Sequence, residues 1–404
     1  MPKVSSRGLA LPPSPIRKLS PYAEAAKARG VKVFHLNIGQ PDLETPKVMR
    51  DRLKSIDPVI AYSPSAGTPQ YLAAMCRYYA TVGLHIEPAN VVATTGGSEA
   101  LFFAFLCLAE VGDEVIVAEP FYTNYNSFAA MAGVRLVPVQ SRGEEGFHLP
   151  PREAYEAALT PRTRFVLLCN PNNPTGTVYS REEVLRVASF CRDHDLFLVS
   201  DEVYREFVYD GLTATSALDL EGFEDRVVVV DSLSKRFSAC GIRLGCFVSR
   251  NAELIATVTR AAQGRLSPPG LAQVLALGMS EIGEDYHDSV RAEYQKRRDV
   301  LQEQLEKLPG IFLRKPEGAF YVVARLPVSD SDDFARFLLE DFSFEGATVM
   351  VAPAAGFYAT PGLGLNEVRI AYVLNCDDLR RAIHVLGEGL KAYAHRAAPV
   401  LATA

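Results

Sequence analysis

The sequence contains no tryptophan, and its seven cysteines include no CxxC pair. An odd number of cysteines, most of them in apolar stretches, favours buried free thiols over a disulfide framework and a reducing cytoplasm over a secreted location. The cysteines in apolar surroundings are Cys107, Cys169, Cys191 and Cys246. The seven histidines are scattered without the spacing of metal ligands, so no metal site is predicted.

Basic clusters and long apolar runs are also absent. The net formal charge is −6 without any basic run, which argues against a nucleic-acid partner and against an anionic membrane. The longest apolar run, around residues 100–109, is too short to cross a bilayer. Pro12, Pro13 and Pro15 stand where a secretory signal would have its apolar core, so we expect no signal peptide.

The centre of the chain shows a regular alternation of strand-like and helix-like segments. The predicted strands are 91–95, 114–118, 135–139, 165–169, 196–200, 227–231 and 244–249. Strands that alternate with helices indicate crossover units, so we predict an α/β fold whose mostly parallel seven-stranded sheet lies between helices. In such sheets the ligand crevice lies at the carboxyl ends of the strands.

Both ends of the chain are predicted to form a second, smaller α+β unit. The strand predicted over 31–38 has no obvious partner in the large sheet, and strand and helix signals return after Pro309-Gly310. A helical stretch over 269–308 is expected to connect the two units. We therefore predict a large domain over 47–295 and a small domain built from 1–46 and 296–404.

The stretch Ser232–Arg243 follows an apolar strand and carries two hydroxyls, a lysine and an arginine. A lysine in such a loop is by default a solvated charge. Together with the hydroxyls and the arginine, however, Lys235 suggests an amine that forms an imine beside groups that hold a phosphate. Arg236 and partial burial would favour the neutral amine that attacks a carbonyl.

Three other strand ends carry polar residues, and each has a plain structural alternative. Two glycines in Thr94–Ala100 would let a helix start bind an anion, or would form only a tight turn. The run Asn170–Gly176 forces a rigid loop that either presents amides to a crevice or lies on the surface. Asp201, at the end of a buried strand, either faces a cationic ligand or caps a helix or pairs with a structural arginine.

Arg369 lies in an apolar-flanked strand, where it either pairs with a carboxylate of the protein or binds a carboxylate ligand through its fork of donors. The residues alone favour the structural pair.

Taken together, the motifs GGSEA, NPNNPTG, SDEVY, SLSK with a later Arg, and RIAY resemble the class I and II aminotransferases of pyridoxal-phosphate fold type I, in order and in spacing. The segments NIGQPD and AYSPSAGTPQ are similar to the bacterial aspartate aminotransferase branch. The resemblance extends from about Ile16 to the C-terminal helix.

This resemblance implies pyridoxal 5′-phosphate as cofactor and a role for each matching residue. Lys235 would be the Schiff-base lysine and proton shuttle, with Asp201 and Tyr204 as the other catalytic residues. Asp201 would keep the pyridine nitrogen protonated, and Asn173 and Tyr204 would bond the phenolic oxygen. The other cofactor-binding residues would be Gly97, Ser98, Glu99, Ser232, Ser234 and Arg243, most of them around the phosphate, with Tyr122 stacked on the ring and Tyr62 reaching from the neighbouring subunit. Arg369 would bind the substrate α-carboxylate, helped by Gly39, Tyr122 and Asn173.

The activity implied is an aminotransferase of amino acid metabolism. It would move an α-amino group from an L-amino acid, with aspartate or a related amino acid as candidate donor, to a 2-oxo acid such as 2-oxoglutarate by a ping-pong mechanism. Shared active sites imply a homodimer. A carbon–sulfur β-lyase on the same fold would use the same residues and is the alternative, and a cofactor-binding regulator would need a basic DNA-binding module that the sequence lacks.

One position departs from the resembled branch. Aspartate-using relatives often carry a lysine where this chain has Ser98, and that lysine binds the distal carboxylate. Arg17 and Arg265 are two candidates to replace it, although each is more often a surface charge.

Overall fold

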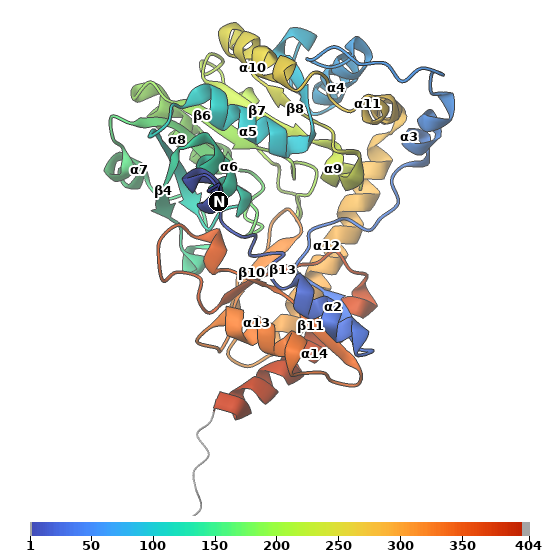
Figure 1. The fold of residues 1–404 in the computed structure, drawn as a ribbon, viewed down its shortest axis with the longest axis vertical. Helices are drawn as coiled ribbons and strands as arrows, with labels where there is room; N and C mark the ends of the chain where they lie inside the picture. The colour runs from blue at the N-terminus through green and yellow to red at the C-terminus, as the bar shows by residue number, and fades with distance from the viewer. Residues whose placement is uncertain (1, 398–404) are drawn as a thin grey trace, which may run out of the picture.

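The computed structural model describes residues 2–397. A seven-stranded sheet forms the centre of its upper lobe (Figure 1). From one edge to the other its strands are β2 (Val91–Thr94), β8 (Gly245–Val248), β7 (Val227–Ser232), β6 (Phe197–Asp201), β5 (Thr163–Cys169), β3 (Glu114–Glu119) and β4 (Arg135–Gln140). All neighbours are parallel except β8, which is antiparallel to both of its neighbours. The predicted α/β fold with a mostly parallel sheet is confirmed.

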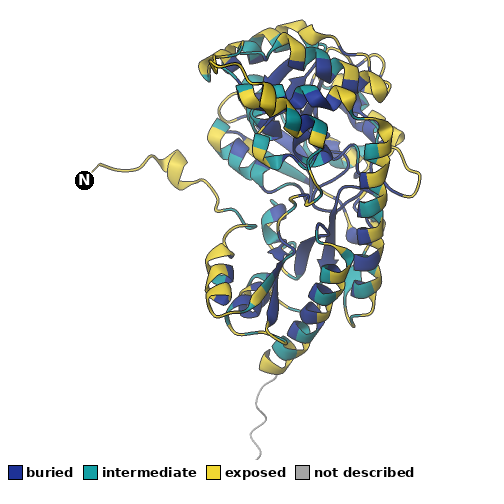
Figure 2. Ribbon diagram, turned by 90° about the vertical axis from the view of Figure 1, so that its right-hand side faces the viewer, coloured by how far each residue is buried: buried dark blue, intermediate teal, exposed yellow. Residues whose placement is uncertain are grey.

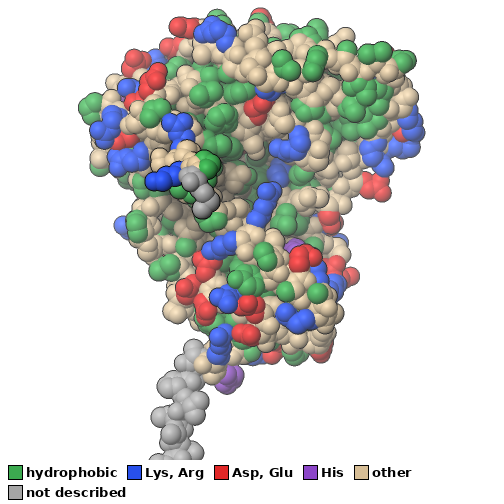
Figure 3. Space-filling model, viewed as in Figure 1, with side chains coloured by type: hydrophobic (Ala, Val, Ile, Leu, Met, Phe, Trp, Pro, Cys, Tyr) green, Lys and Arg blue, Asp and Glu red, His purple; other side chains and the backbone are tan. Residues whose placement is uncertain are grey.

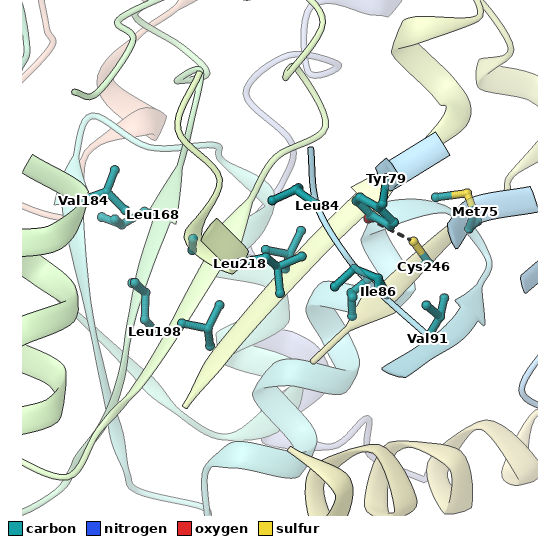
Figure 4. Packing of buried hydrophobic residues seen from close by; sticks show 14 of the residues in the cluster. Met75, Tyr79, Leu84, Ile86, Val91, Leu168, Val184, Leu198, Leu218 and Cys246 are labelled. Atoms are coloured by element: carbon teal, nitrogen blue, oxygen red, sulfur yellow. Dashed lines mark hydrogen bonds between the residues drawn. The ribbon is translucent and has the colours of Figure 1, made fainter. Parts of the chain in front are cut away.

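Helices cover both faces of this sheet because alternate strand residues point to opposite sides. In β7, Val228 and Val230 pack into the core on one face, and Val227 and Val229 pack into the core on the other. The first face carries α5 (Gly96–Leu108), α6 (Asn124–Ala132) and α10 (Ala252–Gly264). The second carries α4 (Pro69–Thr81), α7 (Arg152–Ala158), α8 (Arg181–Asp193) and α11 (Gly270–Ala276). Figure 4 shows part of this second core, where Met75 and Tyr79 of α4 lie near Cys246 of β8.

The lower lobe has its own core and two small sheets. A four-stranded sheet runs in the order β12 (Ala352–Pro353), β13 (Glu367–Ala371), β10 (Tyr321–Arg325) and β9 (Phe312–Leu313). Strand β1 (Lys32–His35) pairs with β11 (Ala347–Met350), so the N-terminal strand lies with C-terminal elements, as predicted. The helices of this lobe are α2 (Ser20–Ala28), α13 (Ser331–Glu340) and α14 (Cys376–Ala397). In Figure 2 most strands are buried, and the exposed residues lie on the outer faces of the helices, on loops and along the N-terminal segment.

The prediction of a single connecting helix over 269–308 is wrong. The chain forms α11, then a 3₁₀ turn (Leu277–Glu281), and only then α12 (Glu284–Glu306). Gly283 is extended at the N-cap, and two acidic residues follow it in the first turn of α12, a favourable start for a new helix. Helix α12 extends from the upper lobe into the lower one (Figure 1), and the predicted domain boundary at 295/296 lies inside it.

Candidate active site

A cavity of about 590 Å³ lies between the two lobes. Its walls come from the carboxyl ends of β6 and β7, the start of α5, the small-lobe strands β10 and β13, and the N-terminal segment around Arg17. The position agrees with the rule that ligands of parallel sheets bind at strand carboxyl ends. Figure 3 shows Lys and Arg side chains gathered in the hollow between the lobes. The predicted site residues that line the cavity are Gly39, Gly97, Ser98, Tyr122, Asn173, Asp201, Tyr204, Ser232, Ser234, Lys235, Arg243 and Arg369.

Lys235 lies on the short helix α9 (Leu233–Arg236), which begins directly after β7. Its amine donates a hydrogen bond to the carbonyl oxygen of Gly39 at 2.7 Å. Gly39 has no room for a side chain, because a Cβ there would lie 1.7 Å from the Tyr321 hydroxyl. The lysine is therefore presented to the cavity by a turn of the large lobe and held by the backbone of the N-terminal segment.

Arg236 does not face the Lys235 amine, contrary to the expectation that its charge would act on that group. Its guanidinium is buried on the other side of α9, where it pairs with Asp231 and lies 3.8 Å from the centre of the Tyr78 ring. Burial opposes the ionisation of Asp231, but Arg236 and Arg205 outweigh burial and hold its pKa below the ordinary value. This buried pair ties the helix that carries Lys235 to strand β7.

Asp201 is a buried carboxylate without a cationic partner among the described residues. Only 4% of it is exposed, and its strongest contact is the Tyr125 hydroxyl, which donates to it at 2.9 Å. Burial raises the pKa of Asp201 to about 7, although the Tyr125 hydrogen bond acts to lower it. A carboxylate in this state is suited to accept a hydrogen bond from a protonated nitrogen in the cavity.

A second part of the cavity is built to hold an anion. The N-terminus of the 13-residue helix α5 is lined by Gly97 and Ser98, and Ser232, Ser234 and Arg243 converge on the same end. Arg243 donates to the Ser234 hydroxyl at 3.4 Å. A Cβ on Gly96 would lie 2.5 Å from the Arg243 guanidinium, so the glycine allows this approach. Free N–H groups at a helix start, hydroxyls and a guanidinium together suit a phosphate.

Arg369 is buried but pairs with no carboxylate of the described residues, so the structural pair favoured by the sequence alone is wrong. Its guanidinium donates to the Asn173 side-chain oxygen at 3.1 Å and to the carbonyl of Asn37, and its Nε has no partner. Asn173 also donates to the Tyr204 hydroxyl at 3.5 Å, and that hydroxyl lies 3.0 Å from the Tyr321 hydroxyl. These contacts leave a buried arginine available to a carboxylate ligand.

Residues 31–386 of the chain match the family described as aminotransferase class I and II. The chain belongs to this family. Because the family and its named relatives are aminotransferases, the protein is a transferase enzyme that moves amino groups, and the lyase alternative is not favoured. Aminotransferases of this family depend on pyridoxal phosphate.

The names of two relatives of this aminotransferase refer to aspartate and to prephenate. An aspartate aminotransferase of Geobacillus stearothermophilus is 29% identical over 403 residues, which cover 97% of this chain and 100% of the relative. An aspartate/prephenate aminotransferase of Thermus thermophilus is 32% identical over 388 residues, which cover 94% and 97%. The resemblance to the aspartate aminotransferase branch is therefore confirmed.

Solved aminotransferase structures share the fold over almost the whole chain. The Thermus thermophilus aspartate aminotransferase with maleate superposes with a TM-score of 0.86 at 30% identity, covering 96% of this chain and 100% of that one. An alanine aminotransferase from Pyrococcus furiosus gives 0.88 at 27% identity with the same coverage. Fold type I is thus confirmed. No helix among the described residues is long and apolar enough to span a membrane.

Three residues considered for the site lie outside this aminotransferase's cavity. Glu99 accepts a hydrogen bond from the Thr95 amide at 2.7 Å and pairs with Arg265 at 3.0 Å, so it braces the turn before α5. Arg265 also donates to the carbonyl of Ala93 at 2.6 Å. Tyr62 is 83% exposed on a loop of the large lobe.

Sequence reasoning missed Tyr125, Tyr321, Cys240 and Asn124. Tyr125 contacts Asp201, and the others line the cavity. A tyrosine on an apolar helix or strand face is ordinarily a core residue, so the sequence carries no signal for Tyr125 or Tyr321. Cys240 and Asn124 lie close to recognised motifs, and that proximity is the only signal that could have indicated them.

Proposed function

We propose that this enzyme transfers the α-amino group of an L-amino acid to a 2-oxo acid, with pyridoxal phosphate held in the cavity between the lobes. The observation that carries the proposal is Asp201, a buried carboxylate without a cationic partner among the described residues, in the same cavity as Lys235. The residues fit both the ring and the phosphate of the group, because Asp201 suits a protonated ring nitrogen and the start of α5 suits a phosphate.

Each wall residue has a role in holding the cofactor. Asp201 would keep the ring nitrogen protonated, and Asn173 and Tyr204, which are already hydrogen-bonded to each other, would bond the phenolic oxygen. Tyr122 would stack on the ring. The phosphate would be held by the start of α5 at Gly97 and Ser98, together with Ser232, Ser234 and Arg243.

Bound pyridoxal phosphate supplies a positively charged ring that stabilises the carbanion formed when Cα of an amino acid loses its proton. The chain's own residues do the rest. Arg369 binds the α-carboxylate and so fixes the direction of the Cα–H bond. The Lys235 amine, once free, takes the Cα proton and returns it, as general base and then general acid. The Gly39 carbonyl, which accepts from this amine, orients it.

We further propose a homodimer with shared active sites. Tyr62 lies beside Val59 and Ile60, which are 76% and 66% exposed, so this loop presents a contiguous apolar surface. A second copy of the chain that covers the loop would bring Tyr62 to the partner's phosphate end. The free state of all seven cysteines supports a cytoplasmic location.

The experiment is a panel of amino acids tested against 2-oxoglutarate, oxaloacetate and pyruvate with the reconstituted enzyme. We expect transamination by the wild type and none by Lys235→Ala, which should still bind the cofactor without a covalent bond. Normal turnover in Lys235→Ala would contradict the proposal. Release of pyruvate and ammonia from cysteine conjugates without an acceptor would favour the β-lyase instead.

A further inference from the structure

The cavity carries more positive charge than its carboxylate balances. Its basic lining residues are Lys235, Arg243, Arg369 and Arg17, and Asp201 is the one acidic residue among the described residues that line it. The proposed function gives Arg243 a phosphate, Arg369 an α-carboxylate and Lys235 the cofactor aldehyde. Arg17 is thus the cation for which the cofactor and a simple amino acid supply no anion.

Arg17 lies on the N-terminal segment before α2, and this segment is fixed against the site. The Asn37 side chain donates to the carbonyl of Ile16 at 3.1 Å, while the Asn37 carbonyl accepts from Arg369. Pro15 packs so closely on Gly356 that a Cβ there would lie 2.7 Å from the proline ring. One asparagine therefore links the backbone beside Arg17 to the guanidinium that would hold the α-carboxylate.

The charge of Arg17 is available to a ligand, whereas the charges of Lys18 and Arg265 are paired with carboxylates of the protein. The adjacent Lys18 pairs with Asp332, and Arg265 pairs with Glu99 outside the cavity. Among residues 2–397, no acidic side chain pairs with Arg17, although it lines the cavity. Arg265 is therefore a structural residue of the large lobe, and Arg17 is the unpaired cation.

Tyr122 indicates that Arg17 and Arg369 face a common space. Burial raises the pKa of Tyr122 to about 12 and Tyr321 adds to this rise, while the charges of Arg369 and then Arg17 act in the opposite direction. Both guanidinium groups thus act on the same phenol. Both guanidinium groups line the same cavity, and two cations in one cavity suit a ligand with two carboxylates.

On the basis of these contacts, and resting on the proposed function, we propose that Arg17 is the specificity-determining residue that binds the distal carboxylate of a dicarboxylic substrate. Arg369 binds the α-carboxylate of the same molecule. Ser98, a neutral hydroxyl at the start of α5, supplies no charge for this task. The distal group is thus recognised from the N-terminal segment rather than from the large lobe.

The test compares L-aspartate with L-2-aminobutyrate, which has the same carbon chain but a methyl group in place of the distal carboxylate. Single-turnover absorbance of the holoenzyme without a 2-oxo acid isolates the donor half-reaction. In Arg17→Ala the preference for aspartate should fall about 10- to 50-fold, the value of one charge-assisted hydrogen bond at a partly solvated site. Arg17→Lys should restore part of it. Binding of maleate, a dicarboxylate that cannot react, should weaken by a similar factor, while binding of acetate should not change.

Lys18→Ala is the matched control, because it removes the neighbouring charge but leaves Arg17 in place. It should leave the aspartate preference unchanged. An unchanged preference in Arg17→Ala, or a wild type that does not prefer aspartate to 2-aminobutyrate, would overturn the inference. Conversion of 2-aminobutyrate by Arg17→Ala at the wild-type rate would show that the cofactor site is intact. If the wild type converts no amino acid at all, the proposed function fails instead.

Discussion

The two walls of the cavity differ in how far their residues are buried. On the large-lobe wall, Asp201, Ser232 and Ser234 are buried at the ends of strands or in the turn that follows. On the N-terminal wall, Ile38 is 43% exposed and Arg17 is exposed as well. The sheet therefore fixes the groups proposed to hold the cofactor, and the proposed contact with a variable side chain comes from a segment outside the sheet.

Arg369 shows where this division lies. It comes from the small lobe, yet it is buried and donates to Asn173 of the large lobe. The α-carboxylate is common to all amino acids, so its binding group belongs with the fixed residues. What varies between substrates lies beyond it, toward the N-terminal segment.

The largest effect is expected on the fixed wall. Asp201→Ala removes the acceptor proposed for the ring nitrogen, and amino transfer should fall about 100- to 1000-fold because the stabilising charge is lost. Single-turnover absorbance with the best donor measures the rate. Asp201→Glu keeps the charge and should retain more activity than the alanine variant. Wild-type turnover in Asp201→Ala would show that this wall does not carry the chemistry.

The anchoring of Lys235 can be tested through stability. Asp231→Ala leaves the Arg236 guanidinium buried without its partner, so the free energy of unfolding should fall by about 3–5 kcal/mol. Urea unfolding measures this change. Asp219→Ala, which breaks the exposed pair with Arg181, should cost less than about 1 kcal/mol. Equal losses in both variants would contradict the view that α9 is anchored by the buried pair.

Arg369→Ala should separate the common anchor from the selective one. Without this guanidinium, kcat/KM should fall about 100-fold for every donor, whatever its side chain, because the α-carboxylate loses a buried charged partner. The measurement is kcat/KM for aspartate and 2-aminobutyrate in parallel. A loss confined to aspartate would mean that the two arginines have exchanged roles.

A separate effect is a pH dependence of stability in the protein without cofactor. Because the pKa of Asp201 is raised from its ordinary value near 3.8 to about 7, the folded state keeps a proton that the unfolded state releases. The stability from this group is present below about pH 4 and is lost as the pH rises through 7. Relative to Asp201→Asn, the wild type should lose about 4 kcal/mol over this range in chemical denaturation. A difference that does not change with pH would contradict a neutral buried carboxyl.

Much of the sheet could be predicted because most of its strands are buried on both faces. Such strands form nearly continuous apolar runs, and all seven were placed within two residues. The break before α12 was missed because the stretch around Gly278 and Gly283 has helical composition on both sides. Gly278 is close-packed on the backbone of Met49, where a Cβ would lie 2.7 Å from Met49 Cα. A contact so distant in the chain leaves no local pattern.

The site was less predictable where a side chain's direction matters. Arg236 was expected beside the Lys235 amine, but α9 turns it to Asp231. Glu99 belongs to a recognised motif, but its carboxylate turns to Arg265. In both cases the motif indicated the position of the backbone, while the oppositely charged residue that pairs with the side chain lies on another element. The fate of a charged side chain depends on tertiary contacts that spacing does not encode.

Asn37 has a consequence for anyone who wishes to redesign this enzyme. Its amide holds the Ile16 carbonyl and its carbonyl holds Arg369, so a single residue sets the distance between the selective and the common anchors. Exchange of Arg17 alone would change which side chains are accepted at little cost to the general anchor. Substitution of Asn37 would remove the side-chain amide that holds Ile16, while the backbone carbonyl that accepts from Arg369 would remain, so the selective anchor would loosen more than the common one. The N-terminal segment is therefore an exchangeable module, provided that Asn37 is kept.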